Sequence, residues 1–115
     1  MKPLHSISSI NVAQDIRDLI LLINHSYSNE RITVSKDDVK RWINHLTYDQ
    51  SLWVKLVVDG CMIASGIAEY DDNTKEGIIE WVQVLPEYQR QGYGRMIVER
   101  LLHRLSKKAD FVTVS

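Results

Sequence analysis

Residues 52–85 carry three β-rich runs in close succession, and this pattern constrains the fold more than any other feature of the chain. The run LWVKLVV ends at Asp59 and Gly60, a dipeptide typical of a two-residue hairpin turn, and the return strand is expected over residues 61–70. The polar turn DDNTKEG then leads into a third run, IIEWVQVL. Pro86 ends this run because proline has no amide hydrogen to donate to a sheet. The segment therefore predicts a three-stranded antiparallel meander.

Helical periodicity flanks this meander on both sides. Asn11 followed by Gln14 is typical of a helix cap, and apolar residues recur at helical spacing from there to about Tyr27. Ser35 followed by Asp38 predicts the start of a second helix, with Val39, Trp42, Ile43 and Leu46 on its apolar face. A third helix is expected after Gly94, with Ile97, Val98, Leu101, Leu102 and Leu105 on one side, and the run FVTVS reads as a last strand.

These elements predict an α+β fold in the order β-α-α-β-β-β-α-β, with a mixed, mostly antiparallel sheet flanked by helices. The run that ends before Pro86 connects through a helix to the last strand, so these two strands are expected to be parallel neighbours. With 115 residues, the chain is expected to form a single domain over residues 1–115. A content of 44% hydrophobic and 25% charged residues excludes a disordered or fibrous chain.

The remaining composition limits location and chemistry. No apolar run approaches the ~18 residues of a membrane helix, and no secretory signal is recognisable, so a cytoplasmic protein is expected. The single cysteine, Cys61, excludes an internal disulfide and is expected to be a small buried residue. The histidines fall in unrelated elements, so no metal site is expected, and the tryptophans are expected in the core rather than as stacking platforms for nucleic acid.

Positive charge is concentrated near the third helix. Residues 1–89 carry 8 basic and 13 acidic side chains, a net of −5, whereas residues 90–108 carry 6 basic side chains against Glu99 alone, a net of +5. Such a segment either attracts phosphate or forms an ordinary solvated helix face.

The turn before the third helix contains two glycines one residue apart, Gly92 and Gly94. Glycine permits positive φ, and the first amides of a helix have no acceptor within it, so a strand-to-helix turn of this kind suits an anion such as phosphate. The Lys-Ser/Thr pair of a Walker loop is absent, and so is the third glycine of a dinucleotide fingerprint. The alternative is that the glycines only allow the chain to turn and that the turn binds no ligand.

The run Gln89-x-x-Gly92-x-Gly94, preceded by VQVLPEY and followed by an amphipathic helix, resembles the Q/RxxGxG/A motif of the GNAT superfamily of N-acetyltransferases. The resemblance covers about residues 8–115 and implies acetyl-coenzyme A as the acetyl donor. It implies that the donor's pyrophosphate binds the backbone of one loop, whose members are Gln89, Arg90, Gln91, Gly92, Tyr93, Gly94 and Arg95. It also implies that pantetheine pairs with the backbone of Val82, Gln83 and Val84, with the Val82 N–H on the thioester carbonyl.

Strand alternation places Glu80 on one face with Val82 and Val84, toward the expected cleft, and Trp81 and Gln83 on the other. Glu80 is therefore our candidate for the base that accepts the proton of an acceptor amine, and Glu69 is the second candidate. The alternative for Glu80 is a solvent-facing glutamate paired with a base on the neighbouring strand.

Relative to the GNAT pattern, the chain is expected to be truncated after the fifth strand, without the usual C-terminal helix and strand pair. Two functions therefore stay open: an N-acetyltransferase that uses direct attack by an amine, or a non-catalytic acyl-coenzyme A-binding or protein-interaction module derived from that fold. The exposed last strand further predicts self-association, most simply as a homodimer.

Overall fold

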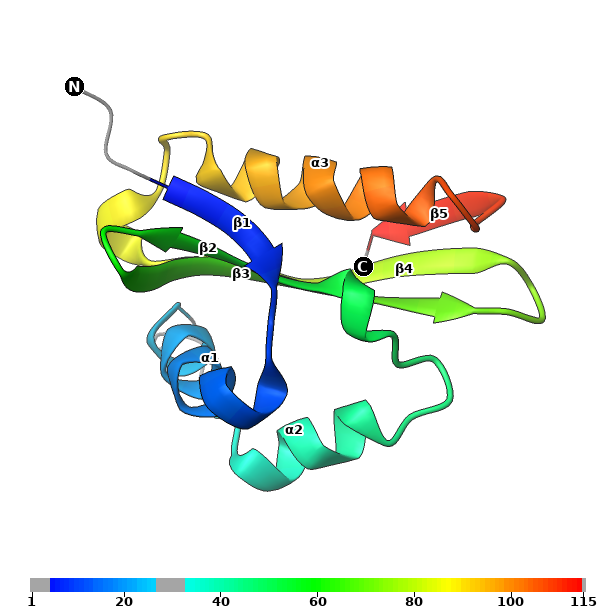
Figure 1. Cartoon of the computed structure of the whole chain (residues 1–115), viewed down its shortest axis with the longest axis horizontal. Helices are drawn as coiled ribbons and strands as arrows, with labels where there is room; N and C mark the ends of the chain where they lie inside the picture. The colour runs from blue at the N-terminus through cyan, green and yellow to red at the C-terminus, as the bar shows by residue number, and fades with distance from the viewer. Residues whose placement is uncertain (1–4, 27–32, 115) are drawn as a thin grey trace.

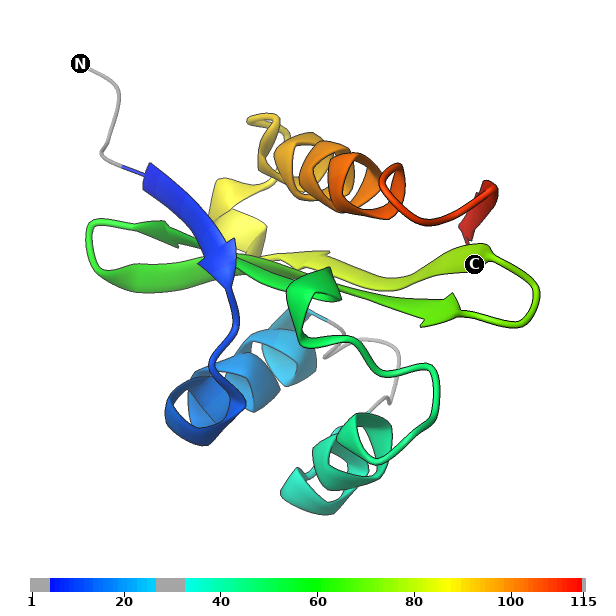
Figure 2. The same ribbon diagram turned by 45° about the vertical axis from the view of Figure 1, so that its right-hand side comes forward.

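The structure is a computed structural model that describes residues 5–26 and 33–114. Figures 1 and 2 show a central sheet with helices on both faces. No helix in these described ranges is long and apolar enough to cross a membrane. The elements, in chain order, are β1 (His5–Ser9), α1 (Val12–Ser26), α2 (Lys36–Ile43), the 3-10 turn η2 (Gln50–Leu52), β2 (Trp53–Val58), β3 (Cys61–Asp71), β4 (Glu76–Val84), the 3-10 turn η3 (Pro86–Tyr88), α3 (Tyr93–Leu105) and β5 (Phe111–Val114).

The five strands form one sheet in the order β1-β2-β3-β4-β5. Strands β1 to β4 pair antiparallel with their neighbours, and β5 pairs parallel with β4, as the sequence predicts. Asp59 (φ 50°) and Gly60 (φ 83°) both have positive φ, which is the geometry that a tight hairpin with a right-handed twist requires. The predicted α+β class, element order and parallel crossover are confirmed.

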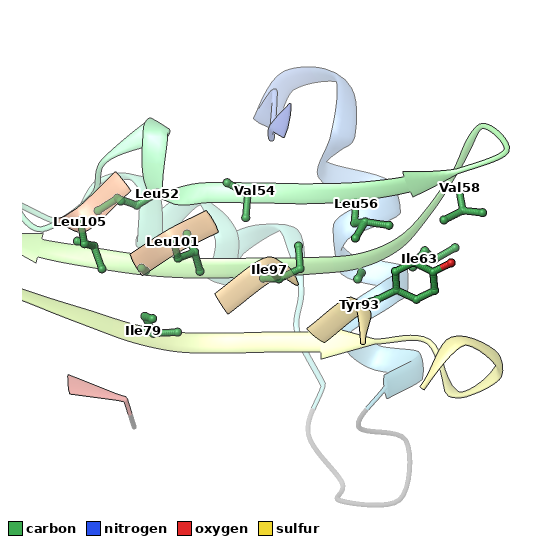
Figure 3. Packing of buried hydrophobic residues seen from close by; sticks show 12 residues of the cluster. Leu52, Val54, Leu56, Val58, Ile63, Ile79, Tyr93, Ile97, Leu101 and Leu105 are labelled. Carbon is green, nitrogen blue, oxygen red and sulfur yellow. The ribbon is translucent and has the colours of Figure 1, made fainter. Parts of the chain in front are cut away.

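Helix α3 covers one face of the sheet, and α1 with α2 covers the other (Figures 1 and 2). Beneath α3, Ile97, Leu101 and Leu105 are fully buried against β2, β3 and β4. Figure 3 shows how these side chains follow the sheet from Leu52 to Tyr93. This cluster fixes where the first turn of α3 lies relative to the end of β4.

The tryptophans organise the opposite face. Trp53 is buried, and Trp42 meets its ring edge-on at 6.3 Å between centroids. Trp42 also stacks on Trp81 at 5.5 Å, which joins α2 to β4. The prediction that all three belong to apolar packing is confirmed, although Trp42 and Trp81 are only half-buried.

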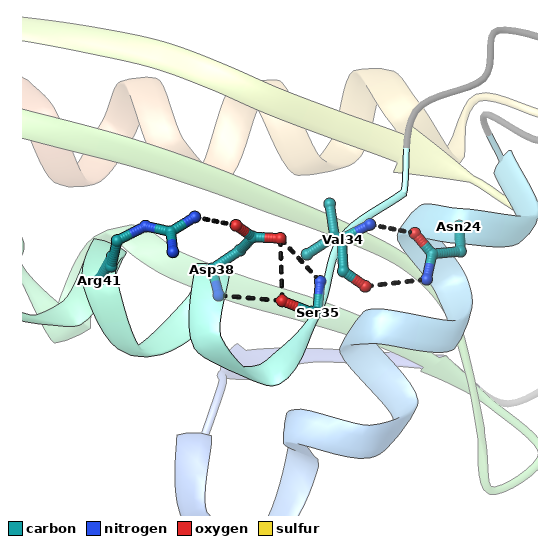
Figure 4. Close-up of polar contacts among 5 residues, drawn as sticks. All are labelled: Asn24, Val34, Ser35, Asp38 and Arg41. Carbon is teal, nitrogen blue, oxygen red and sulfur yellow. Dashed lines mark hydrogen bonds and ion pairs between the residues drawn. The ribbon is translucent and has the colours of Figure 1, made fainter.

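Polar contacts join the end of α1 to the start of α2 (Figure 4). The Asn24 side chain accepts from the Val34 amide at 2.7 Å and donates to the Val34 carbonyl at 3.0 Å. The predicted helix start at Ser35 and Asp38 is confirmed, and these residues form a capping box in which each side chain bonds the backbone N–H of the other residue. These contacts set the position of α2, whose C-terminal end leads into the loop beside β3.

Two local predictions are wrong. Helix α2 ends at Ile43, so Leu46 is fully exposed instead of lying on the apolar face. Cys61 is exposed because it follows the hairpin turn directly. At the start of α1 the predicted cap is present, because the Asn11 side chain accepts from the Gln14 amide at 3.4 Å, and the Asn11 amide in turn donates to Asp15 at 2.8 Å. The predictions for Tyr27 and Ser115 lie outside the described residues, and self-association stays a prediction.

Gly66 allows α3 to approach β3 closely, and this contact yields a stability test. A Cβ at Gly66 would lie 2.3 Å from Ile97 Cγ2 and 2.9 Å from Leu101 Cδ1. Gly66→Ala is therefore expected to lower the free energy of unfolding by about 1–3 kcal/mol, measured by urea denaturation. Gly94→Ala is the matched control: its Cβ meets only Val84 Cγ2, at 3.5 Å. Equal stabilities of the two variants would contradict this close approach.

Candidate active site

Strand β4 contains a β-bulge at Glu80. Ile67 of β3 lies opposite Trp81, but the next residue, Ala68, lies opposite Ile79, so Glu80 is the extra residue on β4. A bulge re-aims side chains locally and bends the strand. The bulge therefore breaks the alternation of side chains between Glu80 and Trp81.

The bulge makes the predicted distribution of faces wrong. Val82 and Val84 pack with the cluster under α3, and Trp81 packs with the cluster under α1 and α2. Glu80 interacts with Glu69 and His45, and so lies on the α2 side, away from Val82 and Val84. The sequence pattern contains no sign of the extra residue, because a strand prediction assumes unbroken alternation.

The carboxylate of Glu80 has a raised pKa. Partial burial is the main cause, and the neighbouring Glu69 carboxylate raises the pKa further through its charge and a hydrogen bond. His45 has a smaller, opposite effect. Glu80 is exposed on its outer side, so water and acceptor molecules have access to a carboxylate that binds a proton more tightly than usual.

Thr47 holds the second carboxylate of this group. Its hydroxyl donates to Glu69 Oε2 at 2.8 Å, and its carbonyl accepts from the Tyr70 amide at 3.1 Å. A cavity of about 620 Å³ lies between the loop after α2 and the β3–β4 hairpin, and His45, Thr47 and Tyr70 are among its lining residues. Sequence analysis missed Thr47 and His45, which lie more than 20 residues before Glu69 and belong to no motif.

Strand β5, as far as the structure describes it, pairs with the first part of β4. The described pairing runs from Glu76 opposite Phe111 to Ile79 opposite Val114, one residue before the bulge. The candidate donor-binding residues Val82, Gln83 and Val84 follow the bulge, beyond this pairing. The Gln83 side chain is buried and donates to Ser65, so only the backbone of Gln83 is placed to meet a ligand.

The loop after β4 is held by its own side chains. Gln89 donates to the Val84 carbonyl at 3.1 Å, and Gln91 donates to the Glu87 carbonyl at 3.3 Å. The contact of Gln89 fastens the loop to the end of β4. The predicted loop residues thus come together as one turn.

The start of α3 suits an anion. Gly92 is the N-cap residue with φ 88°, and no side chain caps the helix. The first bond into the helix runs from the Met96 amide to the Gly92 carbonyl at 3.1 Å, so the earlier amides have no acceptor within the helix. A Cβ at Gly92 would meet nothing within 4 Å, which leaves this side of the turn open to a ligand.

Only part of the basic segment faces this turn. Arg90 and Arg95 flank it, and Arg95 is paired with Glu99 at 2.9 Å. Arg104 instead donates to the Ser51 carbonyl at 2.6 Å, and burial together with Arg100 lowers its pKa. Lys108 is ion-paired with Asp49. The net charge of the segment therefore overstates the charge available to an anion.

The family model of the acetyltransferase (GNAT) family matches residues 16–114, and the chain belongs to this family. Among solved structures it is similar to the ribosomal-protein-S18-alanine N-acetyltransferase from Escherichia coli, with a TM-score of 0.73 and 25% identity, over 90% of this chain and 61% of that chain. For the loading GNATL domain of CurA from Lyngbya majuscula the TM-score is 0.78 and the identity 19%, over 96% and 64%.

A third similar structure is N-acetylglutamate synthase from Neisseria gonorrhoeae complexed with coenzyme A and N-acetyl-glutamate, with a TM-score of 0.70 and 18% identity, over 93% of this chain and 24% of that chain. This chain thus spans less than two thirds of the length of each of these three proteins. No curated protein matches it.

The raised pKa of Glu80 predicts a pH-dependent effect on stability. The folded state binds this proton more tightly than the unfolded chain, so ionised Glu80 destabilises the fold at neutral pH. Glu80→Gln is expected to raise Tm at pH 7, and the gain should vanish as the pH falls below ~4.3, where glutamate is protonated in both states. Glu76→Gln on the same strand serves as the control. A gain that persists at low pH would contradict this assignment.

Proposed function

We propose that this chain is an acetyl-coenzyme A-dependent N-acetyltransferase that transfers the acetyl group to a primary amine by direct attack on the thioester. The observation that carries the proposal is the uncapped, glycine-opened start of α3, placed directly after a bulged strand. Membership of the GNAT family supports the same reaction class.

The backbone of the turn would hold the donor. Gln91, Gly92, Tyr93, Gly94 and Arg95 provide consecutive amides near a helix N-terminus, which suits the two phosphates of a pyrophosphate. Tyr93 is buried, so its ring anchors the turn while its backbone stays at the surface. The space beyond Gly92 is open, so the residues present fit a phosphate that approaches the backbone closely.

Glu80 would receive the proton. As the amine nitrogen bonds to the thioester carbonyl carbon, the carbon–sulfur bond breaks and the proton lost by nitrogen passes to Glu80, directly or through one water. The sulfur leaves as a thiolate and takes up a proton to become the free thiol of coenzyme A. By family likeness the Val82 amide is assigned to the thioester carbonyl oxygen, a contact worth about 2.7–4 kcal/mol in comparable sites.

Donor binding is tested at Gly92 with two isosteric variants. Asn and Asp both tolerate positive φ, so Gly92→Asn and Gly92→Asp place side chains of equal size in the open space, and only Asp adds a negative charge. Calorimetry with coenzyme A should show binding to Gly92→Asp at least about tenfold weaker than to Gly92→Asn. If wild type and both variants are folded and bind equally, the ligand lies elsewhere.

Catalysis is tested at Glu80. Glu80→Gln should lower kcat on the order of 10²- to 10⁴-fold and leave the affinity for acetyl-coenzyme A unchanged, since the side chain acts on the acceptor proton and not on the donor. Release of free thiol with a panel of amines provides the readout. A variant that retains the wild-type rate and pH–rate profile would assign the base elsewhere.

The same two measurements address the alternative function. A wild-type chain that binds coenzyme A and is sensitive to Gly92→Asp, but releases no thiol with any amine, is an acyl-coenzyme A-binding module. A chain that binds no coenzyme A is an interaction module that has kept only the fold.

A further inference from the structure

We infer that Glu69, held by Thr47, forms with Glu80 a pair of carboxylates that takes up one proton, and that Glu69 thereby makes Glu80 the residue that accepts the proton of the acceptor amine. This inference rests on the proposed function, and it adds a residue that acts through the base. Glu69 is a positioning residue in this scheme, because it acts on Glu80 and not on the acetyl group.

The geometry brings the two carboxylates together from neighbouring strands. Glu69 lies opposite Ile78 in the register, and Glu80, two residues after Ile78, lies on the same side of the sheet, within hydrogen-bonding reach of Glu69. Ile79, between them, faces α3. The bulge acts after Glu80, because it places Trp81 on this side as well and returns Val82 to the α3 side.

Thr47 makes the two members of the pair unequal. Its hydroxyl donates to Glu69 Oε2 at 2.8 Å, and a hydrogen bond to a carboxylate favours the ionised form. The bond from the Tyr70 amide to the Thr47 carbonyl, 3.1 Å long, fixes the loop in register with β3. A proton that the pair takes up is therefore expected on Glu80.

The charges that face Glu80 come from two directions. Glu69 approaches from β3 and favours the protonated form of Glu80, and His45 approaches from the loop after α2 and opposes this when it is charged. Two carboxylates within hydrogen-bonding reach of each other repel when both are ionised. The pair changes from a charge of −2 to −1 when it accepts a proton, and this relief of repulsion makes Glu80 a stronger base toward an ammonium group.

The direct test is the titration of Glu80 itself, followed by carboxyl carbon NMR in protein labelled at glutamate, with the signal assigned by its loss in Glu80→Gln. Glu69→Gln keeps the size of the side chain and removes its charge, so the pKa of Glu80 should fall toward the ordinary value. Glu76→Gln removes one charge from β4 without touching the pair and should give a smaller change. Identical Glu80 titrations in wild type and Glu69→Gln would overturn the inference.

Variants at Thr47 separate the hydroxyl from the bulk of the side chain. Thr47→Val removes the donor at constant shape, so Glu69 should compete better for the proton. The change in the Glu80 carboxyl carbon signal on protonation of the pair should then be smaller than in wild type. Thr47→Ser keeps the hydroxyl and should restore the wild-type titration. A Thr47→Val titration equal to that of wild type would contradict the role of Thr47.

Turnover supplies an independent readout through a double-mutant cycle. Glu69→Gln should lower kcat by less than the 10²- to 10⁴-fold loss expected for Glu80→Gln, and should move the acidic limb of the pH–rate profile to lower pH. In the Glu80→Gln background it should cost nothing further, because its effect passes through Glu80. Additive losses would overturn the inference. Since the NMR titration needs neither coenzyme A nor turnover, it tests the pair even if the proposed function fails.

Discussion

Helix α3 lies on the sheet at two positions where the strand residue is glycine, and the candidate site depends on this close packing. A Cβ at Gly66 would lie 2.3 Å from Ile97, and a Cβ at Gly77 would lie 2.7 Å from Leu105. Any side chain there would lift the helix. Because α3 lies this close, its first turn lies beside the end of β4, where a Cβ added at Gly94 would lie 3.5 Å from Val84 Cγ2.

The bulge at Glu80 divides β4 into two parts with different tasks. Before the bulge, Ile79 is buried under α3 and the strand pairs with β5. After the bulge, Val82 and Val84 again pack toward α3, but the described pairing with β5 has ended. One extra residue therefore leaves Glu80 and Trp81 both on the α2 side and returns Val82 and Val84 to the α3 side.

Local patterns predicted much of this fold because each acts over a few residues. The Asp59 and Gly60 turn, the Ser35 capping box and the glycine loop before α3 all depend on short-range backbone geometry, and all are present. The errors arise where contacts between residues far apart in the sequence determine the local structure. The pairing of Ile67 with Trp81 creates the bulge, and the bond from Thr47 to Glu69 spans 22 residues. The apolar periodicity also predicted that α2 reaches Leu46, although the helix ends at Ile43.

The net charge of residues 90–108 was a poor guide to the candidate anion site, because several of these cations bind residues far away in the sequence. Arg100 donates to the Ile7 carbonyl at 3.4 Å and Arg104 to Ser9 Oγ at 2.8 Å, so these cations fasten α3 to β1. What faces the open side of Gly92 is mainly backbone N–H, whose dipoles keep their strength at any ordinary pH. Glu80, in contrast, titrates with a raised pKa. The Glu80 carboxylate is therefore sensitive to pH, whereas the backbone N–H groups of the turn at Gly92 do not titrate.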